Sequence, residues 1–162
     1  MVAVTLKGLI VWDERNDEIE THYRAWQLAR ESREWAVVLE DDALVVPGFT
    51  KHLADALAWA EVAQPGPSYP VVSLYTGTSR PDAKTVTHAV AQAQETGASW
   101  LTSARLRWGV GVAIHATHVE SMLTKYRTYR LPSDQRIGEW ARWKRLKVLH
   151  TYPSLVDHRD EE

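Results

Sequence analysis

The chain of 162 residues contains no cysteine. Because it has no thiol, it can form no disulfide bond or zinc–thiolate site, and it cannot use a cysteine nucleophile. No apolar run approaches the roughly 20 residues that a membrane-spanning helix needs, and the amino terminus shows no signal-peptide pattern. We therefore expect a soluble, cytoplasmic protein with no membrane partner.

Phenylalanine is also scarce, since the chain has one Phe beside eight Trp. We expect some of the indoles to pack in the core and others to form flat platforms of the kind on which sugars stack. The length suffices for one domain with a substantial core and is short for two. A single domain over residues 1–162 is therefore expected.

Neither sign of charge dominates, because 19 Lys and Arg stand against 21 Asp and Glu. The distribution is less even: residues 1–60 carry six basic and eleven acidic side chains, whereas residues 101–150 carry ten and three. An acidic metal-binding half beside a basic half would suit a phosphorylated donor and leaves a polyanionic acceptor open. Solvated helix faces account for the basic half equally well.

Strand-like and helix-like apolar patterns alternate along the chain. This alternation predicts the α/β class. Asn16 is a candidate cap for the first helix, because its side chain can accept a backbone N–H there. The expected strands cover residues 2–12, 35–39, 71–75, 108–114 and 147–149, and the later helices begin near residues 49, 83, 117 and 132.

Three consecutive carboxylates follow the apolar run 35–39, namely Glu40, Asp41 and Asp42. An unpaired ionised carboxylate is very costly to bury, so these acids should lie at the carboxyl edge of the strand. Open α/β sheets bind their ligands at that edge. Clustered carboxylate oxygens suit Mg²⁺ or Mn²⁺, which often takes substrate phosphates as further ligands. This pattern favours a nucleotide-sugar site, although a solvated turn or pairing with Arg would also account for the acids.

Several motifs in a fixed order resemble one known family. The stretch 38–42, Val-Leu-Glu-Asp-Asp, followed by Pro-Gly-Phe at 47–49, resembles the metal motif of small GT-A-type glycosyltransferases. These are similar to the lipopolysaccharide galactosyltransferases of glycosyltransferase family 25. The further segments at 21–26, 73–77, 80–81, 108–111 and 153–159 resemble a related group from actinobacteria and their phages.

The resemblance implies a GT-A-like fold, with a mixed, mostly parallel sheet flanked by helices, and a site that uses Mn²⁺ or Mg²⁺. Asp42 is then the first choice as metal ligand, with Asp41 assisting and His158 completing the shell. Asp134, at an expected helix start, is the candidate base that takes the proton of the acceptor hydroxyl. Each has a plainer explanation, because His158 could simply be exposed and Asp134 could be favoured by the helix dipole alone.

Other polar residues are candidates for gripping the base and ribose of a nucleotide. Asp13 should end the first strand, where an acid can accept from ribose hydroxyls. The resemblance adds Thr21, His22 and Glu40, although His22 could equally be a satisfied helix histidine. Further candidates are Trp108 with Gly109 as a sugar or acceptor platform, and Arg80 and Arg107 at the pyrophosphate, each with a core or solvated alternative.

The sequence thus predicts a metal-dependent glycosyltransferase that moves a sugar from a nucleotide-diphosphate sugar, a UDP-sugar being favoured, to a hydroxyl acceptor. A protein, a glycan and a modified DNA base all remain open as acceptors. The resemblance implies a bacterial or phage enzyme, working in the host cytoplasm in the latter case. The alternative is a shortened, non-catalytic binding module. A nucleotidyltransferase is disfavoured, because the usual Gly-rich amino-terminal loop with Lys or Arg is absent.

Overall fold

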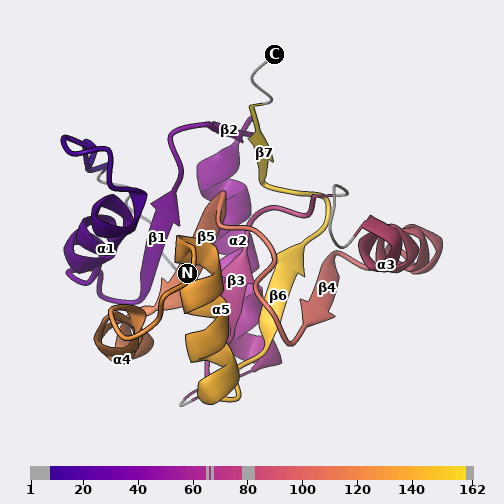
Figure 1. Cartoon of the computed structure of the whole chain (residues 1–162). Helices are drawn as coiled ribbons and strands as arrows, with labels where there is room; N and C mark the ends of the chain where they lie inside the picture. Colours follow the sequence, from indigo (N-terminus) through magenta and orange to yellow (C-terminus); the bar gives the residue numbers. More distant parts are fainter. Residues whose placement is uncertain (1–7, 65, 67, 78–82, 160–162) are drawn as a thin grey trace.

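The computed structural model describes residues 8–64, 66, 68–77 and 83–159, which form a sheet with helices on both faces (Figure 1). The helices are α1 (Glu18–Ala29), α2 (Phe49–Ala63), α3 (Ala83–Thr96), α4 (Ala116–Tyr126) and α5 (Ser133–Trp143). The strands are β1 (Trp35–Leu39), β2 (Ala43–Val45), β3 (Val71–Ser73), β4 (Trp100–Ser103), β5 (Gly111–His115), β6 (Val148–Thr151) and β7 (Val156–His158). The α/β class is confirmed.

The main sheet has the order β1-β5-β3-β6-β4, and β2 pairs with β7 in a separate two-stranded sheet. Only β3 and β6 pair in parallel; the other pairs are antiparallel. The expectation of a mostly parallel sheet was therefore wrong. Because β5 runs antiparallel to both β1 and β3, the strands β1, β3 and β6 share one direction. Their carboxyl ends lie at a single edge, where β5 and β4 begin.

Helices cover the sheet unequally: α1, α4 and α5 lie on one face and α2 on the other (Figure 1). Alternation along the strands places Ala36 and Val38 against the three-helix side and Trp35 against the α2 side. Such a strand is buried on both faces, as its apolar run predicts. Trp26 of α1 and Trp140 of α5 are fully buried, which confirms that some of the indoles pack in the core.

The amino-terminal region differs from the sequence prediction. Residues 8–12 form no strand, and residues 2–7 of the predicted strand lie outside the described ranges. Asp17, rather than Asn16, caps α1, because its carboxylate accepts the backbone N–H of Glu20 at 3.0 Å. Asn16 instead occupies the turn before the cap with a φ of 53°. The short strands β2, β4 and β7 were not predicted, because three or four residues carry too little periodicity.

None of the helices in the described part of the chain combines the length and apolar character needed to cross a bilayer.

Three histidines are buried in or beside the core: His115, His118 and His150. Burial disfavours the charged imidazolium, and it lowers the pKa of each of the three, that of His150 to about 4. All three rings are therefore neutral in the folded protein near pH 7. The unfolded chain binds protons on these groups at higher pH than the folded chain does.

Stability should therefore fall as the pH drops below about 6.5, the ordinary histidine pKa. By pH 5, His150 alone should remove about 2 kcal/mol from the free energy of unfolding, while most carboxyls are still ionised. Urea unfolding at pH 7.5 and pH 5.0 checks this, with the exposed His88→Gln variant of α3 as the control that keeps the pH dependence. Equal stability at both pH values would contradict the buried neutral state.

Candidate functional site

The three carboxylates lie at the carboxyl edge of β1, as the sequence predicts. Glu40 follows Leu39 directly, and its backbone N–H donates to the Val110 carbonyl at 3.0 Å, which ties the end of β1 to the segment entering β5. The chain then turns, and Ala43 begins β2. The acids are partly or fully exposed, in keeping with the cost of burying unpaired charge.

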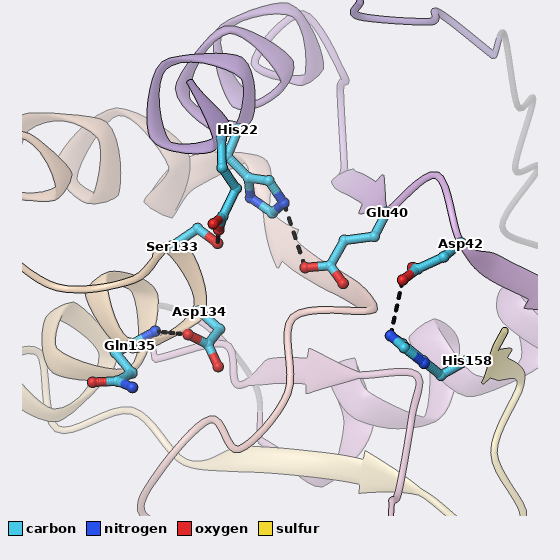
Figure 2. A network of polar contacts seen from close by, with 8 residues as sticks. His22, Glu40, Asp42, Ser133, Asp134, Gln135 and His158 are labelled. Carbon is cyan, nitrogen blue, oxygen red and sulfur yellow. Dashed lines mark hydrogen bonds and ion pairs between the residues drawn. The ribbon is translucent and has the colours of Figure 1, made fainter. Parts of the chain in front are cut away.

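The pairing of β2 with β7 brings Asp42 and His158 together from distant parts of the chain. Ala43 lies opposite His158 in this pair, and the Arg159 N–H donates to the Asp42 carbonyl at 3.0 Å. The His158 Nε2 lies 2.8 Å from Asp42 Oδ2 (Figure 2). The other oxygen, Asp42 Oδ1, is buried and has no hydrogen-bond partner among the described residues. Two predicted metal ligands thus meet, and one oxygen is left with unused acceptor capacity.

The predicted trio is only partly assembled. Asp41 is exposed, and the described residues hold no group of three or more His, Cys, Asp or Glu side chains placed to bind one ion. Two ligands at right angles on Mg²⁺ lie about 2.9 Å apart, close to the Nε2–Oδ2 separation. Mg²⁺ commonly takes one or two carboxylates and completes its shell with phosphate oxygens and water. Asp42 and His158 therefore fit part of such a shell.

A second cluster lies beside the first, between α1, the end of β1 and the start of α5. His22 Nε2 lies 3.6 Å from Glu40 Oε1, with the imidazole 12% and the carboxylate 27% exposed (Figure 2). Gly109 separates Glu40 from Asp134: a Cβ at this glycine would lie 2.8 Å from Glu40 Oε1 and 3.2 Å from the Asp134 Cβ. The structure thus brings together four of the predicted residues, with the absent side chain of Gly109 leaving room for both carboxylates.

Asp134 stands in the first turn of α5, where its Oδ1 accepts the Gln135 N–H at 2.6 Å. Burial raises the pKa of its carboxyl, and the negative charges of Glu40 and Glu18 raise it further, while the Gln135 hydrogen bond acts in the opposite direction. The neighbouring Ser133 donates to Glu18 Oε1 at 2.7 Å, which links the starts of α5 and α1. Asp134 therefore has the environment of a carboxyl that takes up a proton more readily than usual.

Thr21 lies on the first helix, as predicted, whereas Asp13 lies differently from its predicted place. Asp13 ends no strand; its Oδ1 accepts the N–H groups of Arg15 and Asp17 in the exposed turn before α1. The hydrogen bond from the Asp17 N–H is the largest cause of a lowered pKa at Asp13. The Arg15 N–H and the Thr21 hydroxyl lower that pKa further. Asp13 thus organises the entry to α1, and its role at a ribose stays a prediction.

Trp108 packs edge-on against the rings of Tyr75 and His150, with centroids 5.7 and 6.0 Å away. It is partly buried, so the indole is neither a core residue nor a fully open platform. Arg80 lies outside the described residues. His150 and Glu18 were not predicted, although the polar end of the run Val148-Leu149-His150 could have drawn attention to the first. Glu18 gave no signal, because an acid in a first helical turn is common.

No protein-family model, curated protein or solved structure matches this chain. The family resemblance of the motifs therefore stays a prediction, and the site has to be judged on its own geometry.

The close approach of Glu40 and Asp134 to Gly109 leads to a testable prediction. Gly109→Ala should displace the flexible end of the Glu40 side chain and crowd the Asp134 Cβ by a few tenths of an ångström, so the free energy of unfolding should fall by roughly 1 kcal/mol, the low end of overpacking costs. Urea unfolding measures the change. Gly8→Ala is the matched control, because a Cβ at Gly8 meets nothing within 4 Å. Equal stability of the two variants would show that the gap between the two carboxylates is not needed.

Proposed function

We propose that this chain is a metal-dependent glycosyltransferase that uses a nucleotide-diphosphate sugar, with Mn²⁺ or Mg²⁺ held by Asp42 and His158. The observation that carries the proposal is the pair itself: an imidazole nitrogen 2.8 Å from a carboxylate whose second oxygen is buried without a partner among the described residues. An acceptor atom left unsatisfied in this way is costly unless a ligand completes it. A divalent cation is a ligand of the right chemistry.

When bound, the metal would neutralise the charge of the nucleoside diphosphate as it leaves. Asp134 would take the proton of the acceptor hydroxyl while that oxygen forms its bond to the sugar carbon and the bond from that carbon to the phosphate oxygen breaks. A carboxyl whose pKa is raised is a better base for this step than an ordinary one. Glu40 and His22 would hold the donor beside Asp134, because the missing side chain of Gly109 leaves room for the carboxylates of Glu40 and Asp134 next to each other.

One observation favours a second candidate, a non-catalytic module that binds a nucleotide or a glycan. The described residues hold no group of three or more His, Cys, Asp or Glu side chains that could bind one ion, so Asp42 and His158 would offer two ligands. A site of two ligands binds a metal weakly on its own and depends on the phosphates of the nucleotide. The two candidates differ in whether bound sugar is transferred, and both require a nucleotide to bind.

Metal-dependent nucleotide binding is the first prediction of the proposal. UDP-, GDP-, dTDP- or ADP-sugar at one hundred times its Kd should stabilise the protein by about 2.7 kcal/mol, a rise in melting temperature of roughly 5–10 °C, in the presence of Mn²⁺ only. Asp42→Ala should lose the shift and keep its own melting temperature within a few degrees, because the edge carboxylate adds little to the core. Thermal-shift measurements check both.

The matched control is Asp55→Ala, since Asp55 is an exposed acid of α2 that pairs with Lys51 of the same helix. It should keep the full shift. If no nucleotide shifts the wild type with Mn²⁺, the proposal fails. If Asp42→Ala unfolds on its own, Asp42 is a structural acid.

The role of Asp134 is tested separately. Asp134→Asn should lower kcat by roughly 10²–10⁴-fold, the usual contribution of a general base, while the nucleotide-induced thermal shift is retained. The measurement is release of nucleoside diphosphate during turnover with an acceptor. Glu139→Gln in the same helix is the control, because Glu139 is paired with Arg142 on the outer surface. A kcat unchanged within threefold in Asp134→Asn would exclude this residue as the base.

A further inference from the structure

The edge that carries Glu40 continues along the sheet to two further polar residues. On the face covered by α5, the apolar residues Val71 and Val148 are each followed, two positions on, by Ser73 and His150. The parallel register of β3 and β6 sets Ser73 beside His150. The same edge therefore carries a second group of polar side chains, Ser73 and His150. Gly109 and Trp108 lie between this group and Glu40.

His150 is 2% exposed, and its hydrogen bonding is incomplete. Its Nδ1 lies 3.5 Å from the Tyr75 carbonyl, whereas its Nε2 has no hydrogen-bond partner among the described residues. Burial lowers the pKa to about 4, although the carbonyls of Tyr75 and Arg105 act in the opposite direction, so the ring is neutral near pH 7. Because a carbonyl can only accept, Nδ1 carries the single proton in the tautomer that makes this contact. Nε2 is then an acceptor that needs a donor.

A hollow lined by residues of α3, β4 and the end of β6 lies against this histidine. Its volume is about 80 Å³, and it is partly open to solvent. Thr76 forms a fixed part of its wall, because its N–H donates to Ser154 Oγ and its hydroxyl to the Thr151 carbonyl, both at 2.9 Å. The other polar and aromatic lining residues besides His150 are Thr85, Thr102, Ser103, Arg107 and Trp108.

The chemistry of the lining separates two classes of small ligand. A phosphate ester is mostly a dianion near neutral pH, so its oxygens only accept and would face the acceptor Nε2 of a neutral His150. Among the described lining residues, Arg107 is the one charged group. A sugar hydroxyl both donates and accepts, so it can donate to Nε2 and accept from Thr or Ser hydroxyls or from Arg107. The partly buried indole of Trp108 adds an apolar surface for a sugar ring.

We propose that this hollow binds a monosaccharide unit, with His150 accepting a hydrogen bond from one of its hydroxyls. Its identification as the acceptor's sugar rests on the proposed function, because the hollow follows the same sheet edge as Asp134 and Glu40. The binding itself does not need the nucleotide or the metal. The two proposals can therefore fail independently.

The test is saturation-transfer NMR with the methyl glycosides of glucose, galactose, mannose and N-acetylglucosamine, in the presence of EDTA and without nucleotide. At least one glycoside should bind the wild type. His150→Gln and Thr85→Val should raise its Kd roughly tenfold, the effect of one lost hydrogen bond. Thr85 is exposed on α3, so its variant keeps the test open if His150→Gln folds poorly.

His118→Gln is the matched control, because His118 is also buried with an unpartnered Nε2 but packs against Tyr69 and Trp140 instead. It should bind like the wild type. The proposal is overturned if no glycoside binds, if Thr85→Val and His150→Gln both bind as well as the wild type, or if inorganic phosphate competes with the glycoside. Nucleotide binding with Mn²⁺ in the absence of glycoside binding would leave the transferase proposal intact and refute this one.

Discussion

The cost of removing carboxylates from water determines where β1 must end. The strand is buried on both faces up to Val38, and the next positions carry Glu40, Asp41 and Asp42. No packing of the neighbouring helices could cover three adjacent charges without partners. The end of β1 is therefore fixed at the rim of the sheet, and β3 and β6, which run the same way, deliver their own polar ends to that rim. The antiparallel β5 completes it by bringing Trp108 and Gly109 to the same place.

The local parts of this arrangement could be predicted from the sequence, whereas the long-range pairings could not. The five helices and the strands β1, β3, β5 and β6 follow from apolar periodicity, and the acids at the edge follow from solvation. The direction of β5 did not follow, because a buried apolar run has the same appearance in parallel and antiparallel pairs. The first predicted strand failed over residues 8–12 because β-prone residues there have no described partner strand to pack against.

In the candidate site, too, the local features could be predicted and the long-range contacts could not. Asp42, His158, Glu40 and Asp134 were chosen by residue type and motif, and the structure joins them in two neighbouring clusters. His150 and Ser133 were missed, because their surroundings are set by elements distant in the chain: His150 by Tyr75, and Ser133 by Glu18. Asp13 was assigned to a strand end that does not exist, since its carboxylate was already used by two backbone N–H groups. The residue type and the motif at one position predict the chemistry of its side chain, but they do not predict which distant residue that side chain contacts.

The two-stranded sheet of β2 and β7 has a consequence for dynamics. It holds His158 beside Asp42 through three residue pairs and one flanking backbone hydrogen bond at each end, and Leu44 and Val45 remain exposed on β2. Val156 at the other end is fully buried and tied to the Leu74 carbonyl, so the ribbon is anchored at its start and lightly held at its tip. Elements with few buried contacts open at a much lower free energy than the core. The His158 half of the pair can thus separate from Asp42 by local opening while the five-stranded sheet stays intact, and any ligand bridging the two would close that opening.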